Sequence, residues 1–261
     1  MSLLNAAQKA ETHVDMTQTV NTSSARVLPE GTALVRLTEY IDYGTQLVTK
    51  FGTNETEPKP VMRLGFRIVG GQGKNAKGEI EQYVKEAGQF PVIRTFDVVL
   101  SRHIKSRAVK LFNLLNYKRT HKHFANMLGE LFFLKITHET KDGKVVHRPQ
   151  WDSLSAPINP VTSEFVDAPA ITDEHVRLFL WDNPTTEMWD SLFIEGKFDD
   201  GASKNKDQER ILEATNYLGS RLEALLNGGA LPELTQPAAP AETAQVDTPA
   251  VEAEPDADVP F

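Results

Sequence analysis

Apolar and polar residues alternate in five segments of the first 160 positions, and this period of two predicts half-buried β-strands. The segments are 33–51, 61–69, 91–100, 130–139 and 145–151. In the second segment, Arg63 and Arg67 lie opposite an apolar face, and we expect that face in the core and both arginines on the outer surface. The apolar face consists of Met62, Leu64, Phe66 and Ile68.

Glycines and helix-capping residues predict the turns and helices between these strands. Gly44 inside the first segment predicts a bend or bulge, and Asp142–Gly143 predicts a tight hairpin turn between the last two strands. Ser106 is a suitable N-cap for a helix, and Gly129 suits the C-cap of a second short helix. The first helix would carry an apolar stripe made of Val109, Leu111, Phe112, Leu114 and Leu115.

The order of elements favours a mainly β fold with added helices, specifically a five-stranded OB-fold barrel with long loops, because a helix separates the third and fourth strands. The same order also permits other α+β folds. Four parts are expected: a disordered arm (1–30), an OB-fold domain (31–160), a helical extension (161–229) and a disordered acidic tail (230–261). Within the extension, short helices are expected at 172–180 and 185–194, and a longer one over 207–226.

Charge is distributed unevenly along the chain, although the total is only −8. Residues 34–151 carry 20 basic and 11 acidic side chains, whereas residues 152–261 carry 6 basic and 22 acidic ones. A basic segment of this size favours a polyanionic partner.

Single-strand binding needs cations that follow the phosphates and aromatic rings on which bases stack. Several basic and aromatic residues of the first 160 positions are candidates for this chemistry. Arg36, Thr38 and Tyr40 share one face of the first strand, and we expect that face on the exterior of the barrel. The candidate DNA-binding residues are Arg36, Tyr40, Arg63, Arg67, Lys74, Lys77, Arg94, Phe96, Arg102, Lys105, Arg107, Tyr117, Lys118, Arg119, Lys122 and Trp151.

The acidic tail ends in Asp256, Asp258, Val259, Pro260 and Phe261. Residues 235–261 hold five prolines, six acids and no base, a composition typical of disorder. A terminal ring can fill a small pocket on a partner while its carboxylate pairs with an Arg or Lys. The tip therefore predicts a partner-binding site.

This tip resembles the acidic, aromatic tip of bacterial single-stranded DNA-binding proteins. Three stretches resemble single-stranded DNA-binding proteins of tailed bacteriophages: LSRHIKSRAVKLF (100–112), LGELFFLKITHETKDGKV (128–145) and WDSLSAPINP (151–160). The resemblance covers roughly 31–160 and, more weakly, 161–200. It implies an OB-fold, non-enzymatic coat for single strands in phage replication and recombination, located in the bacterial cytoplasm, which recruits replication proteins such as a polymerase, helicase or primase through the tip.

Motifs for other chemistry are incomplete in this sequence. GGQGKNAKG (70–78) lacks the spacing of a phosphate-binding P-loop, and His103, His121 and His123 suit phosphate contacts better than a metal. We expect no cofactor, no metal, no catalysis and no membrane span. Two alternatives stay open, namely a protein–protein interaction adaptor of a replication complex and a strand-annealing recombination protein. The sequence also leaves a monomer or a dimer open.

Overall fold

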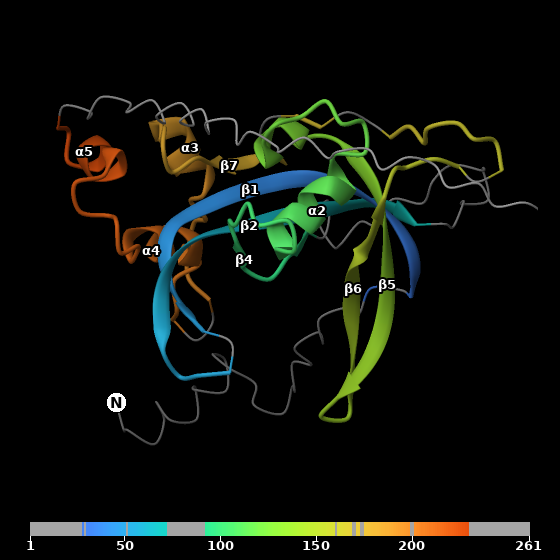
Figure 1. Cartoon of the computed structure of the whole chain (residues 1–261), viewed down its shortest axis with the longest axis horizontal. Coiled ribbons are helices and arrows are strands. Elements are labelled where there is room, and N and C mark those ends of the chain that lie inside the picture. The colour runs from blue at the N-terminus through green and yellow to red at the C-terminus, as the bar shows by residue number, and fades with distance from the viewer. Residues whose placement is uncertain are drawn as a thin grey trace, which may run out of the picture.

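The fold is mainly β, built on a seven-stranded sheet with short helices around it (Figure 1). The computed structural model describes residues 28, 30–50, 52–71, 92–159, 161–168, 171–172, 175–198 and 201–229. The expected arm before residue 28, the tail after residue 229, and Lys74 and Lys77 lie outside the described residues. None of the described helices is long and apolar enough to cross a membrane.

Five of the strands follow one another in the sheet order β3-β2-β1-β5-β6, while β4 pairs with β2 and β7 pairs with β1. Every pairing is antiparallel except the parallel one between β1 and β7. The strands are β1 (Gly31–Thr49), β2 (Thr56–Gly71), β3 (Val92–Arg94), β4 (Val98–Val99), β5 (Leu131–Lys141), β6 (Lys144–Ser155) and β7 (Arg177–Phe179).

The mainly β class is therefore confirmed, but the sheet is open. Among the described strands, no pairing joins β3 or β4 to β6, so the expected five-stranded barrel is not closed by hydrogen bonds. Helix α2 (Arg107–Leu115) contacts both β4 and β6 and occupies the space between the two ends of the sheet (Figure 1). β3 has three residues and β4 has two, so this end of the sheet offers little backbone for pairing with β6.

Both turn predictions are confirmed. Gly44 has φ +67° at a break in the β1–β2 register, and a Cβ atom there would lie 2.6 Å from the ring of Trp181. Asp142 and Gly143 both have positive φ values, 51° and 72°, as a tight hairpin turn between twisted strands requires.

The helix between strands also agrees with the sequence. The Ser106 side chain accepts a hydrogen bond from the Val109 amide at 3.1 Å, which caps α2, and Ala108, Leu111 and Leu115 are buried. A 3-10 helix, η3 (Phe124–Met127), follows, and Gly129 comes after it with φ +89°.

The C-terminal region differs from the expectation of a helical extension. The predicted helix 172–180 is wrong, because Arg177–Phe179 forms β7 along the middle of β1. The predicted helix 207–226 is interrupted, since Gly219 has φ +77° between its two halves. The helices here are α3 (Thr186–Ser191), α4 (Lys206–Leu212) and α5 (Arg221–Leu226).

The sheet is covered by two hydrophobic cores. The main core lies between β1, β2, β5, β6, α2 and η3, and it contains the predicted apolar face of β2. A second core joins β1 and β2 to the C-terminal elements through Ile41, Tyr43, Phe179, Leu192 and Ile211. The described elements between residues 177 and 226 are therefore packed against the sheet rather than appended to it.

Candidate nucleic-acid interface

The α2 segment presents a dense group of cations to solvent. Residues 100–124 hold seven Lys and Arg side chains and no Asp or Glu. All seven of these residues are exposed: Arg102, Lys105, Arg107, Lys110, Lys118, Arg119 and Lys122. Within the described part of the chain, only Lys118 among them forms an ion pair, with Glu130 at 3.1 Å. We call these seven residues the α2 basic surface.

An exposed aromatic ring borders this surface. Phe96, between β3 and β4, is 62% exposed, and the Arg107 guanidinium lies 5.7 Å from the centre of its ring. An exposed ring beside a cation has the chemistry that stacks a base and holds its phosphate. Tyr117 is less accessible because it packs against Phe132 and Phe165, with ring centres 5.8 and 6.2 Å away.

A pocket of about 300 Å³ opens between α2 and η3. Its apolar lining comes from Leu100, Ala108, Val109, Phe112 and Phe124. The remaining lining residues are Ser101, Arg102, Lys122 and His123. The pocket therefore combines an apolar interior with two cations of the α2 basic surface, and no carboxylate lines it.

Hydrogen bonds fix the wall of this pocket at η3. The Ala125 amide donates to Nδ1 of His123 at 3.2 Å, so the neutral ring carries its proton on Nε2, 3.4 Å from the hydroxyl oxygen of Tyr40. Burial lowers the pKa of His123, although Asp182 opposes this shift. The Tyr40 ring also stacks on Phe124, and the Phe112 and Phe124 rings meet edge to face at 5.1 Å.

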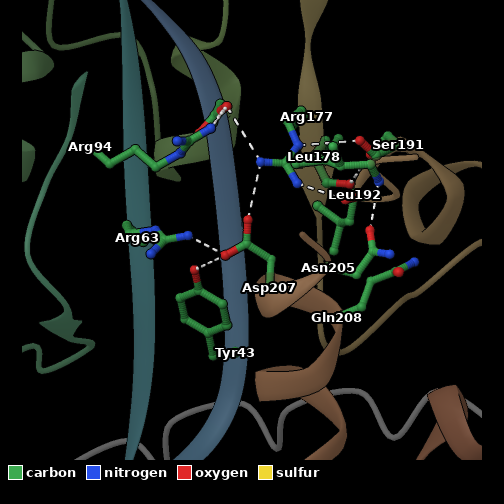
Figure 2. A network of polar contacts seen from close by, with 12 residues as sticks. Tyr43, Arg63, Arg94, Arg177, Leu178, Ser191, Leu192, Asn205, Asp207 and Gln208 are labelled. Atoms are coloured by element: carbon green, nitrogen blue, oxygen red, sulfur yellow. Dashed lines mark hydrogen bonds and ion pairs between the residues drawn. The ribbon is translucent and has the colours of Figure 1, made fainter. Parts of the chain in front are cut away.

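The polar face of β2, in contrast, is covered by the C-terminal elements. Asp207 of α4 lies between Arg63 of β2 and Arg177 of β7, as Figure 2 shows. The Tyr43 hydroxyl donates to Asp207 at 2.7 Å, and Arg177 Nη1 lies 3.1 Å from its other oxygen. Burial alone would raise the pKa of Asp207, but Arg63, the Tyr43 hydrogen bond and Arg177 hold it below its ordinary value.

Glu39 of β1 continues the same network. Arg94 donates two hydrogen bonds to its carboxylate, at 2.6 and 2.7 Å, and Arg177 lies 3.6 Å away. The expectation that Arg63 and Arg67 form an open outer face is therefore wrong, because Arg63 is only 24% exposed and Arg67 is half-buried. Their strand has the predicted alternation, but both of its faces are covered.

Three further candidates lie in the interior. Arg36 is buried and donates to the carbonyl oxygens of Gly129 and Ala168 at 3.1 and 3.0 Å, and the Tyr40 side chain is fully buried. The predicted exterior position of these two residues is wrong, and a register shift between Leu37 and Glu39 separates them on β1. Trp151 is also buried, against Phe66 at 5.5 Å, so its ring is not placed to stack on a base.

The structure thus brings together the candidates at 102–122 and separates them from those on β1 and β2. The pocket itself was missed, along with the roles of Leu100, Val109 and Phe124. One signal was present in the sequence: the apolar stripe of α2 is wider than one buried face, so Val109 and Phe112 extend beyond Ala108, Leu111 and Leu115.

Neither a search for metal ligands nor comparison with known proteins assigns a function to this site. Within the described ranges, no three His, Cys, Asp or Glu side chains gather as a group that could hold a metal ion. A comparison with protein-family models finds no match for this chain, and a comparison with curated protein sequences finds none either.

Proposed function

We propose that this protein binds single-stranded DNA without sequence specificity and without catalysis, and that the α2 basic surface is its contact region. The observation that carries the proposal is the set of exposed cations between Arg102 and Lys122, six of which have no carboxylate partner among the described residues. Unpaired cations on a rigid element attract phosphates and release counterions on binding.

The element order supports an OB-like reading of the sheet. A long, bent β1 pairs with both β2 and β5, and α2 stands between β4 and the β5–β6 hairpin. In this interpretation β3 and β4 are one interrupted third strand, and α2 takes the place of direct pairing between the barrel ends. OB folds commonly bind oligonucleotides, so this likeness agrees with the charge argument.

Titration with labelled oligo-dT tests the proposal. The full chain should bind oligo-dT more tightly than duplex DNA of the same length, because a stacking surface needs unpaired bases. Affinity should fall with salt, with a log–log slope of about −0.7 for each phosphate neutralised. Equal or tighter binding of the duplex would contradict the proposal.

Charge reversal tests whether the α2 basic surface is the DNA contact. The triple variant Arg102→Glu, Lys105→Glu, Lys122→Glu should bind well over about tenfold more weakly at low salt, with a salt slope shallower by about 2. Lys204→Glu with Lys206→Glu is the control, since it reverses charge beside Phe198, on the C-terminal elements. If both variants lose affinity equally, net charge rather than the α2 basic surface governs binding.

A further inference from the structure

We propose that the pocket between α2 and η3 receives one unstacked nucleobase of the bound strand, while Arg102 and Lys122 hold its neighbouring phosphates. This inference rests on the proposed function and adds a subsite to it. A surface of cations alone would bind the backbone only, whereas the pocket gives the same surface a place for a base.

The size of the pocket selects a single ring system. Its volume of about 300 Å³ is at the lower end of the range of small-molecule pockets, roughly 300–1,000 Å³. The Phe112 and Phe124 rings stand nearly perpendicular, at 82°, and so form a corner. A flat heterocycle fills such a corner by stacking on one ring and meeting the edge of the other.

Charge selects an anion at the entrance. Arg102 and Lys122 are exposed, line the pocket, and form no ion pair among the described residues. His123, which also lines the pocket, caps η3 in its neutral form, because its Nδ1 accepts a hydrogen bond from the Ala125 amide. A ligand that is flat and apolar at one end and anionic at the other matches this lining, and a nucleotide unit has that form.

Few groups in the pocket can read the identity of the base. Apart from the two cations, Ser101 and His123 are the only polar lining residues, and the Ser101 hydroxyl already accepts the His103 amide at 3.3 Å. Recognition therefore depends on stacking rather than on a hydrogen-bond pattern, which agrees with binding of little sequence preference.

A pocket-filling variant tests the inference in the full chain. Val109→Trp should fill the pocket from α2, and Asn113→Trp is the matched control because Asn113 is exposed on the same helix and does not line the pocket. Binding is measured by anisotropy with labelled oligo-dT and with an abasic oligonucleotide of equal length. Val109→Trp should weaken oligo-dT binding about tenfold, a typical contribution of one stacked base. The abasic strand should bind the wild type and both variants alike.

Photo-crosslinking gives a second measurement that does not depend on how well the variant folds. An oligonucleotide containing bromodeoxyuridine should crosslink the wild-type chain within residues 100–124, and Phe112 and Phe124 are the expected sites. Suppose that the wild type binds oligo-dT, that Val109→Trp binds it with the same affinity, and that the crosslinks lie outside residues 100–124. The inference of a base in the pocket would then be wrong, while the proposed function would stand. Failure of the wild type to bind oligo-dT would overturn both.

An acidic aromatic peptide is the other occupant to be distinguished. Free in solution, without the tether of the full chain, the peptide of residues 256–261 should compete only weakly with oligo-dT for the wild-type chain. If the peptide binds the wild type, Val109→Trp abolishes that binding, and oligo-dT affinity is unchanged, then the pocket binds a peptide and the inference is wrong.

Discussion

Glu39 carries a carboxylate into a position of β1 that is only 3% exposed. Space for it comes from the neighbouring strand, where Gly65 has no side chain: a Cβ atom there would lie 2.3 Å from a carboxylate oxygen of Glu39. The missing side chain at residue 65 therefore permits the paired hydrogen bonds from Arg94. A single glycine in an alternating strand marks this close approach.

Gly65→Ala should destabilise the protein by about 1–3 kcal/mol, the usual cost of overpacking a filled site. Chemical denaturation measures the change in the free energy of unfolding. Gly229→Ala is the control, because a Cβ atom there meets its nearest neighbour at an ordinary 3.5 Å. Equal stability of the two variants would show that Glu39 moves aside without cost.

Asp42 gives a pH-dependent prediction. Burial raises its pKa to about 6, although the Gly44 amide donates to the carboxylate at 2.9 Å. Because the pKa in the folded state exceeds the ordinary value, the charged form costs stability above pH 6, and this cost disappears as the pH falls toward 4. Asp42→Asn keeps the acceptor oxygen and should be more stable than the wild type at pH 7.5. Urea denaturation should show that advantage vanish near pH 4, and a constant difference between pH 4 and 7.5 would contradict the prediction.

At this scale, alternation predicted the two faces of β2 but not those of β1. The apolar face of β2 is in the core as expected. Arg36 and Tyr40 were assigned to one exterior face, but the β1–β2 register shifts between Leu37 and Glu39, and Tyr40 lies in the main core. The groups that surround these two side chains come from distant parts of the chain, namely Gly129 and Ala168 at Arg36 and Phe124 at Tyr40.

At the scale of elements, α4 is joined to the sheet by charge as well as by the second core. Asp207 is the only acid of α4 that contacts both Arg63 and Arg177, and all three side chains are at least three-quarters buried. Gln208, the next residue, donates to the carbonyl oxygen of Trp189 at 2.9 Å and connects α4 to α3.

Asp207→Ala should destabilise the protein by roughly 2–4 kcal/mol. Removing one partner of a fully buried ion pair costs about 3–5 kcal/mol, and the cost here should be smaller because Arg63 keeps some contact with water. Hydrogen exchange should increase in β7 and α4 and remain unchanged in β5 and β6. Glu139→Gln removes the exposed partner of Arg148 in the hairpin and should change stability little. If hydrogen exchange instead increased equally in all strands of the sheet, Asp207 would stabilise the whole fold rather than the attachment of α4 and β7.

Local signals explain which elements were predicted. Four of the five predicted strands, the Ser106 cap and the Asp142–Gly143 turn are confirmed, and each depends on a few neighbouring residues. The predicted strand 91–100 is instead divided into β3 and β4. Segment 172–180 was predicted as a helix because its apolar spacing is ambiguous over so short a length. Its partner on β1 decided the outcome, and pairing between such distant segments leaves no local pattern.

At the scale of the whole molecule, the basic surface and the acidic C-terminal sequence belong to one chain. Residues 252–261 carry four acids and no base. We propose that this segment competes with DNA for the α2 basic surface and that DNA releases it for partner proteins. Tethering gives such a segment a high effective concentration, on the order of millimolar for a short flexible linker.

Deletion of residues 252–261 should strengthen oligo-dT binding modestly at low salt, and less so near 0.1 M salt, where the screening length falls to about 10 Å. Pull-down of replication proteins should be lost in the same variant and in one that lacks Phe261 alone. Unchanged binding together with unchanged pull-down would leave the segment without either role.

The expected OB-fold domain (31–160) contains only part of the second core. A chain ending at 160 lacks β7, α3, α4 and α5, and so leaves Ile41, Tyr43 and Val61 uncovered. This truncation should be largely aggregated by size-exclusion chromatography, whereas a chain ending at 229 should be monodisperse. A soluble 31–160 fragment with cooperative unfolding would show that the second core is dispensable.

The parallel pairing of β7 with β1 has a consequence for synthesis of the chain on the ribosome. Tyr40 pairs with Leu178, which lies 138 positions later in the chain. At the usual elongation rate of about 5–20 residues per second, the middle of β1 waits on the order of ten seconds for its partner. During that interval the Glu39–Ile41 stretch of β1 has one unpaired backbone edge, which is a site for association with other nascent chains. Slower translation of residues 160–180 should therefore lower the yield of folded protein, and chaperones that shield extended segments should restore it.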